Sequence, residues 1–314
     1  MYKILISDKL GQSGLDYLEQ CDDVIYDMKT GLSKEEIIGI IGDYDGLIVR
    51  SGTRPDAEII AAGSKLKAIG RAGIGVDNID LKAATEHGVI VMNTPRANSI
   101  ATAEQTLALM LAVNRHTAQS HKSVGEGKWE RSKYVGTELY GKTLGILGFG
   151  YIGRLVTQRA QAFGMTVVAY DPYVNQTLAD ELNVTLLPLD EMLAAADIIT
   201  LHAIVTDETK GMINAENIAK MKDGAMIVNV ARGKLINESD LADALKSGKL
   251  AAAALDVFSV EPPTNSPLIG LENVLHTPHL GASSKEAQAA VGSQIAEQVV
   301  NVIRGNSAVN QVNG

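Results

Sequence analysis

The sequence has a single cysteine, Cys21, among 314 residues, and one cysteine cannot form an internal disulfide. Residues 1–10 lack the basic stretch followed by a long apolar stretch that marks a secretion signal, and no run of about 18 apolar residues occurs later. We therefore expect a cytoplasmic protein without a membrane-spanning segment.

Positive charge is also scarce, because 28 Lys and Arg residues face 37 Asp and Glu residues and give a net charge of -9. Such a surface repels phosphate backbones and anionic lipid, so we expect neither a nucleic-acid partner nor a membrane partner. The histidines, the cysteine and the carboxylates show none of the short spacings that bind metal, so no metal site is expected.

Aromatic residues make up only 4% of the chain, although 46% of the residues are hydrophobic. The core must consist of Ala, Val, Ile and Leu, which is typical of buried parallel strands covered by helices and not of a β-sandwich. Two series of apolar strands alternate with helical segments. The strands are expected at 2–7, 46–49, 66–70 and 89–92, and then at 143–147, 167–170, 198–201, 225–229 and 251–255.

This alternation predicts an α/β fold of two doubly wound parallel-sheet domains. Because a helical segment near residues 287–304 follows the second series, we expect it to pack back on the first domain. The expected domains are a discontinuous, flavodoxin-like one at 1–97 plus 287–314 and an inserted Rossmann domain at 98–286.

Three glycines, Gly148, Gly150 and Gly153, lie between an apolar strand and a helix in the spacing G-x-G-x-x-G. They permit a tight turn, close approach of a pyrophosphate and close packing of helix on strand. A strand-to-helix turn that merely contains glycines is the alternative. Asp171 favours the dinucleotide, since it ends the next strand, where a carboxylate accepts hydrogen bonds from a free ribose 2'-hydroxyl. We expect NAD and not NADP.

Arg232, Glu261 and His279 each follow a later strand of the second series, at the sheet edge where such folds bind ligands. A carboxylate beside an imidazole fixes its tautomer and supports proton exchange, and a guanidinium binds a carboxylate through two directed hydrogen bonds. Separately, the arginine could cap an element, the glutamate could be solvated and the histidine could be buried. Their shared placement favours a catalytic trio.

The sequence resembles the D-isomer-specific 2-hydroxyacid dehydrogenases over nearly all its length, and most of all the catalytic part of the phosphoglycerate dehydrogenases among them. The resemblance is carried by residues 71–80, 137–143, 144–153, 229–233, 253–258 and 279–283. It implies that Arg232 binds and polarises the substrate, that His279 exchanges the proton and that Glu261 is its partner.

The resemblance further implies a set of residues around the cofactor and a loop that faces substrate. The cofactor set adds Ile74, Tyr151, Ile152, Ala203, Val230, Ala231, Asp256, Gly281 and Ala282 to Arg232, His279, Asp171 and the three loop glycines. Gly73, Ile74 and Gly75 form the substrate loop. For Asp256, a helix N-cap remains the alternative.

The expected reaction is the oxidation of 3-phosphoglycerate to 3-phosphohydroxypyruvate in serine biosynthesis, because Arg50, Ser51 and Arg131 match basic loops of the phosphoglycerate dehydrogenases. Plain solvation of the two arginines is equally compatible with the sequence. Ile204 departs from the family's usual proline. The chain ends at Gly314, so regulatory C-terminal domains and serine feedback are not expected.

Two alternatives stay open. The chain could reduce glyoxylate, hydroxypyruvate or a sulfonated 2-keto acid with the same trio, or it could be an NAD-gated scaffold that resembles the C-terminal binding proteins. In either case we expect a homodimer, because the apolar helix at 101–113 and the arm at 125–137 exceed what one domain needs and mediate dimers in this family.

Overall fold

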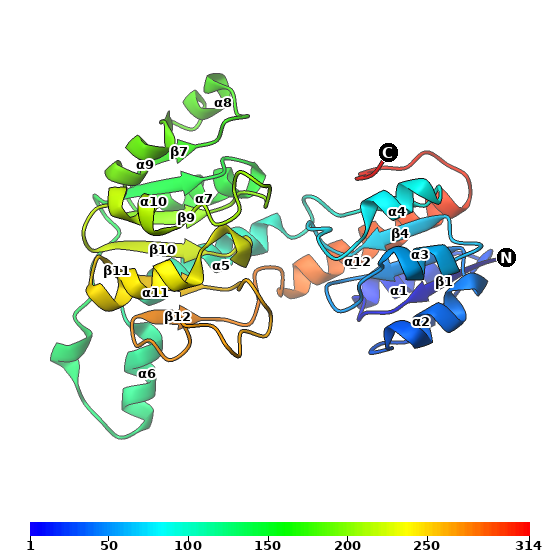
Figure 1. Cartoon of the computed structure of the whole chain (residues 1–314), viewed down its shortest axis with the longest axis horizontal. Coiled ribbons are helices and arrows are strands. Elements are labelled where there is room, and N and C mark those ends of the chain that lie inside the picture. Colours follow the sequence, from blue (N-terminus) through cyan, green and yellow to red (C-terminus); the bar gives the residue numbers. More distant parts are fainter. The chain divides into compact units, whose positions relative to one another are not determined.

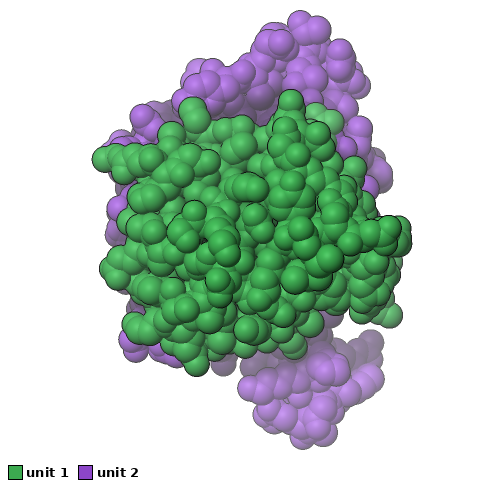
Figure 2. Space-filling model, turned by 90° about the vertical axis from the view of Figure 1, so that its right-hand side faces the viewer, with its two compact units in different colours: residues 1–99, 282–314 green, residues 100–281 purple.

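The computed structural model describes residues 1–314, which divide into two α/β units (Figures 1 and 2). Unit 1 comprises residues 1–99 and 282–314, and unit 2 comprises residues 100–281. Each unit has its own parallel sheet, so the prediction of two doubly wound parallel-sheet domains is confirmed. No helix combines the length and apolar content that a membrane crossing needs.

Unit 1 is built on five parallel strands in the order β2-β1-β3-β4-β5, which is the flavodoxin-like order. The strands are β1 (Tyr2–Ile6), β2 (Val24–Met28), β3 (Gly46–Val49), β4 (Ala68–Arg71) and β5 (Ile90–Met92). All residues of β3 are buried, because helices cover both faces of the sheet. β2 is not among the strands that the sequence predicts, because it is an edge strand in which only Val24 is buried.

Helices cover the two faces of this sheet unequally. One face carries α2 (Lys34–Ile40), α3 (Ala57–Ala62) and α4 (Leu81–Glu86), with a 3-10 turn at Ile41–Asp43. The other carries α1 (Gln12–Glu19) and α12 (Lys285–Ile303), the long helix near the C-terminus. Gly46 and Gly70 let α12 lie close on β3 and β4, since a Cβ at either glycine would come within 2.8 Å of Val299.

Unit 2 contains seven parallel strands in the order β12-β11-β10-β9-β6-β7-β8. They are β6 (Thr143–Leu147), β7 (Thr166–Tyr170), β8 (Thr185–Leu186), β9 (Ile198–Leu201), β10 (Ala225–Asn229), β11 (Leu250–Leu255) and β12 (Val274–His276). The chain order reverses beside β6, whose neighbours are β7 and β9, and this reversal is where doubly wound sheets bind ligands. The two short edge strands, β8 and β12, are too brief to give a clear sequence pattern.

The helices of unit 2 also form two layers. The layer of α5 (Ser99–Asn114), α7 (Tyr151–Ala162) and α8 (Gln176–Asp180) packs on one face of the sheet. The layer of α9 (Leu189–Ala195), α10 (Ala215–Lys220) and α11 (Glu238–Ser247) packs on the other. α6 (Thr117–Gly125) stands beside β12, away from both layers (Figure 1), and a 3-10 turn at Arg131–Tyr134 interrupts the loop expected at 125–137.

Candidate functional site

The glycine loop after β6 occupies the reversal point of the unit 2 sheet. Gly148 has φ +94°, a left-handed conformation that favours glycine, and a Cβ there would lie 2.5 Å from the backbone nitrogen of Ala203. The loops that follow β6 and β9 therefore approach each other closely. Gly153 lets α7 pack on the strand, because a Cβ at this position would lie 2.5 Å from the carbonyl oxygen of Gly148.

Gly150 differs from these two glycines. It has an ordinary negative φ of -71° and caps α7, and a Cβ there would meet no protein atom within 4 Å. Nothing in the protein requires glycine at this position, whereas a pyrophosphate lying against the backbone does. The first residues of α7, Tyr151 and Ile152, follow directly, so the N-terminal N–H groups of the helix surround this open space.

Asp171, just after β7, is fixed by backbone donors on both oxygens. Its Oδ2 accepts the Phe149 N–H at 2.8 Å and its Oδ1 accepts the Tyr173 N–H at 2.9 Å. Each oxygen keeps a lone pair for a further donor. A carboxylate held against the glycine loop fits the ribose of a dinucleotide, so the residues present fit NAD.

The structure brings Glu261 and His279 into direct contact, with 2.8 Å between Glu261 Oε2 and His279 Nδ1. The other glutamate oxygen accepts the N–H of Phe258 at 3.1 Å. Burial alone would raise the pKa of the Glu261 carboxyl, but the His279 hydrogen bond and charge, the Phe258 N–H and the charge of Arg232 outweigh it and lower that pKa. Glu261 is therefore ionised at neutral pH, and the charge of Arg232 acts on it.

His279 adopts φ +56°, a left-handed conformation that is rare for a residue other than glycine. Fully buried Asp256 holds this turn, since its carboxylate accepts hydrogen bonds from the N–H groups of Leu280 and Gly281, each at 2.7 Å, and from the Thr277 hydroxyl at 2.5 Å. Asp256 thus contacts the turn that carries His279, and it is not the N-cap of a helix. Ala282, the next residue after Gly281, begins the second segment of unit 1.

Arg232 lies in a turn after β10 that a buried asparagine organises. The side chain of Asn229 accepts the Ala231 N–H at 3.0 Å and donates to the Arg232 carbonyl at 2.9 Å. A Cβ on Gly233 would collide with the Phe258 backbone, so this turn lies directly against the loop that follows β11. The Cγ1 atom of Val230, in the same turn, lies 2.9 Å from the position that a Cβ of Gly281 would take.

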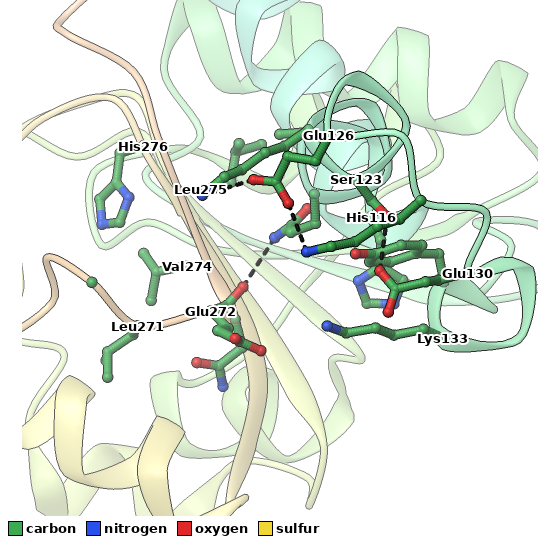
Figure 3. A pocket seen from close by; sticks show the side chains of 17 residues that line it. His116, Ser123, Glu126, Glu130, Lys133, Leu271, Glu272, Val274, Leu275 and His276 are labelled. Atoms are coloured by element: carbon green, nitrogen blue, oxygen red, sulfur yellow. Dashed lines mark hydrogen bonds and ion pairs between the residues drawn. The ribbon is translucent and has the colours of Figure 1, made fainter.

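The hollows of unit 2 include one beside His279 and one beside α6. The smaller, of about 390 Å³, is lined by Asp256, Phe258, Glu261, His279 and their neighbours. The larger, of about 880 Å³, lies between α6 and the segment before and within β12 (Figure 3). Among its charged groups, Lys128 pairs with Glu126 and Glu130 accepts a hydrogen bond from the Ser123 hydroxyl, each at 2.8 Å. The smaller hollow contains the hydrogen-bonded pair Glu261 and His279.

The remaining predicted residues lie mostly in unit 1. Arg50 and Ser51 follow β3, in a loop whose backbone is held by two side chains outside it. Asp8 accepts the N–H groups of Arg50 and Thr53 at 2.6 and 3.0 Å, and Asn78 donates to their carbonyls at 2.8 and 2.6 Å. The loop of residues 73–75 follows β4, also in unit 1, whereas exposed Arg131 begins the 3-10 turn of unit 2.

The polar residues that hold these loops were not among the residues predicted from the sequence, namely Asp8, Asn78, Asn93 and Asn229. A signal was present, because each asparagine or aspartate lies at or just beyond the end of a strand or in a strand-end loop, where its side chain can bond to backbone. Which backbone group each one binds depends on neighbours far away in the chain.

The family model described as D-isomer specific 2-hydroxyacid dehydrogenase, NAD binding domain, matches residues 107–281 of this sequence. The match covers more than half of the chain. The chain belongs to the D-isomer specific 2-hydroxyacid dehydrogenases. Unit 2 contains the family's NAD-binding domain and NAD is the cofactor, so the resemblance seen in the sequence and the cofactor expected from it are confirmed.

Relatives and solved structures extend the similarity to the whole chain. D-3-phosphoglycerate dehydrogenase from Methanocaldococcus jannaschii is 50% identical over 314 residues, which cover 100% of this chain and 60% of that protein. The chain spans about three fifths of the length of the curated relatives it matches.

Two solved structures share the fold over almost their full length. The TT0316 protein from Thermus thermophilus has a TM-score of 0.91 and 35% identity, with 99% of each chain covered. A glyoxylate reductase from Paecilomyes thermophila has a TM-score of 0.90 and 32% identity, with 99% of this chain and 98% of that one covered.

Proposed function

We propose that this chain catalyses the reversible, NAD-dependent oxidation of a D-2-hydroxy acid to the 2-keto acid, with 3-phosphoglycerate and 3-phosphohydroxypyruvate as its substrate pair. The observation that carries the reaction is the contact of 2.8 Å between His279 and ionised Glu261, under the charge of Arg232, in an NAD-binding domain. The named relative from Methanocaldococcus jannaschii supports the choice of acid.

His279 is the proposed acid-base group. Because its Nδ1 faces the Glu261 carboxylate, Nδ1 carries a hydrogen and Nε2 is left to take the hydroxyl proton of the substrate. Glu261 stabilises the imidazolium that results. NAD⁺, when bound, accepts the hydride from C2, so the hydroxy acid loses one proton and one hydride and becomes the keto acid.

Arg232 is the proposed anchor for the substrate carboxylate, since a guanidinium presents two parallel donors in a fixed plane. Loop 73–75 of unit 1 is the second proposed anchor, through its backbone N–H groups. The cofactor contacts are proposed at the glycine loop, at Tyr151 and Ile152, and at Asp171. We also propose that a further set of residues contacts the nicotinamide half of the cofactor. These residues are Ile74, Ala203, Val230, Ala231, Asp256, Gly281 and Ala282.

The phosphate is the least constrained part of this proposal. Arg50 and Ser51 belong to a loop in which the N–H groups of Arg50 and Thr53 already bind Asp8. We therefore propose that a phosphate binds through the side chains of Arg50 and Ser51, or through exposed Arg131, and not through those two N–H groups.

Reduction of glyoxylate or hydroxypyruvate is the second candidate, favoured by the similarity to a glyoxylate reductase over the whole chain. A panel assay separates the two. The protein is mixed with NADH and, in turn, 3-phosphohydroxypyruvate, hydroxypyruvate, glyoxylate and 3-sulfopyruvate, and the loss of NADH absorbance is followed.

We expect the highest kcat/KM with 3-phosphohydroxypyruvate. A higher value with glyoxylate or hydroxypyruvate would replace the proposed substrate but keep the reaction. No turnover of any keto acid, with NADH binding intact, would contradict the reaction and favour the scaffold alternative. Repeating the active reaction with NADPH tests the role of Asp171, because a carboxylate there repels the 2'-phosphate of that cofactor. In Asp171→Ser, the preference for NADH over NADPH is expected to be smaller.

We further propose a cytoplasmic homodimer. α6 and the segment that follows it stand apart from the two helix layers of unit 2 (Figure 1), and they expose Val124, Trp129 and Val135, with Trp129 76% exposed. Apolar side chains on such an arm favour contact with a second copy. Light scattering at micromolar concentration should give twice the monomer mass of 33.3 kDa, and a monomer would contradict the dimer. Cell fractionation tests the location.

A further inference from the structure

Two successive carbonyl groups of loop 73–75 are hydrogen-bonded to the residues that follow β5. The Gly73 carbonyl accepts the Thr94 N–H at 3.1 Å, and the Ile74 carbonyl accepts Nδ2 of Asn93 at 2.6 Å. In a trans peptide the N–H points opposite to the C=O. The N–H groups of Ile74 and Gly75 therefore both point away from the β5 side, and neither has an acceptor within the chain.

Asn93 is itself fixed from two further directions. Its carbonyl accepts Nε2 of Gln298, on α12, at 3.3 Å, and its N–H donates to the carbonyl of Asn310 at 3.3 Å. Asn310 begins the C-terminal segment that pairs with the edge of the sheet, where Gln311 bridges to Met92 in antiparallel fashion. Asn93 is only 8% exposed, and its side-chain amide is hydrogen-bonded to the loop.

A cationic group lies against the same loop. Gly73 has φ +144°, and a Cβ there would collide with the guanidinium of Arg71. Two adjacent N–H groups pointing the same way, beside a positive charge, form an arrangement that binds a carboxylate.

We propose that Asn93 is a positioning residue for substrate binding. Its amide holds the peptide between Ile74 and Gly75 so that the Gly75 N–H donates a hydrogen bond to the substrate carboxylate. The backbone N–H of Thr94 holds the peptide between Gly73 and Ile74 in the same way, and so directs the Ile74 N–H. This inference rests on the proposed function, because it assigns the carboxylate to loop 73–75. A buried asparagine that served stability alone would affect folding without affecting substrate affinity.

The test compares Asn93→Asp and Asn93→Ala with a matched control, Asn313→Ala. Aspartate has the same shape but no donor for the Ile74 carbonyl. Asn313 bonds to Val91 and Val89 along the same strand edge without touching the loop. For each protein, KM and kcat are measured with the keto acid that the unaltered protein turns over best, along with NADH affinity and melting temperature.

We expect Asn93→Asp to raise KM for the keto acid about tenfold, with kcat and NADH affinity within about threefold of the unaltered values, because uniform binding is lost. Asn313→Ala should lower the melting temperature and leave KM unchanged. An unchanged KM in folded Asn93→Asp, or an equal rise in Asn313→Ala, would overturn the positioning role. Inactivity of the unaltered protein would instead overturn the proposed function.

If the Asn93 variants do not fold, hydrogen exchange on the unaltered protein tests whether the backbone of loop 73–75 binds the substrate. NAD⁺ and 3-phosphohydroxypyruvate, which cannot react with each other, should together slow exchange in peptides that cover residues 73–76. No slowing, under conditions where the keto acid is shown to bind, would overturn the inference.

Discussion

The strand-end loops of the two units are built for different tasks. In unit 2, buried Asp256 and Asn229 hold turns whose side chains, His279 and Arg232, do the proposed work. In unit 1, Asp8, Asn78 and Asn93 hold loops in which the backbone is the proposed working part. Both units use buried polar side chains for support, but proton transfer needs one particular side chain, whereas anion binding needs only correctly directed N–H groups.

The largest effect should come from His279 in unit 2. Replacing His279 by Ala should lower kcat about 10²-fold or more, since the proposed acid-base group is removed. A stopped-flow or steady-state assay measures this, and NADH fluorescence titration should show nearly unchanged cofactor affinity. A kcat equal to that of the unaltered protein would break the assignment of proton transfer to unit 2.

Asp256→Asn sharpens the comparison, because it changes a supporting side chain behind a catalytic one. An amide cannot accept from both the Leu280 and Gly281 N–H groups with the same geometry, so a buried donor loses its partner at a cost of about 1–3 kcal/mol in stability. We expect a lower melting temperature and a kcat reduced about tenfold or more. The support in unit 1, at Asn93, should change KM instead. A lowered melting temperature with normal kcat would limit Asp256 to a structural role.

Arg50→Ala tests whether unit 1 also binds the phosphate of the substrate. Loss of a charge-assisted contact should raise KM about tenfold for 3-phosphohydroxypyruvate and leave KM for glyoxylate unchanged. Arg131→Ala is the matched variant in unit 2, and whichever arginine gives the selective rise is the phosphate ligand. Equal rises for both keto acids would show that neither arginine discriminates the phosphate.

The smallest effect concerns stability against pH at Glu261. Its pKa is lowered in the folded protein, so the stabilisation is present above the unfolded carboxyl value of about 4.3 and is lost as pH falls through the lowered folded value. Glu261→Gln removes this contribution. Calorimetry between pH 7 and pH 3 should show the melting-temperature difference between the two proteins shrinking below about pH 4. A difference independent of pH would contradict this origin.

Much of unit 2 was predictable because its signals are local. Gly148, Gly150 and Gly153 lie within six residues of one another. Gly148 and Gly153 are required by close backbone contacts, and Gly150 faces open space that fits a pyrophosphate. Strand β2 and the short strands β8 and β12 were missed, since an exposed edge strand or a strand of two or three residues carries little periodicity. Asn93 was missed because its partners Ile74, Gln298 and Asn310 are distant in sequence.

The sequence alone determined the fold class, the family and the choice of NAD, because apolar alternation, a glycine turn and a carboxylate at a strand end act over short stretches of chain. The sequence also named Glu261 as the partner of His279. Only the tertiary structure decided that Asp256 supports the His279 turn and that Asn93 bonds to the Ile74 carbonyl. These contacts join residues that follow different strands. A parallel sheet brings strand ends together at one edge, but the pairing of side chains there depends on packing and hydrogen bonding in three dimensions.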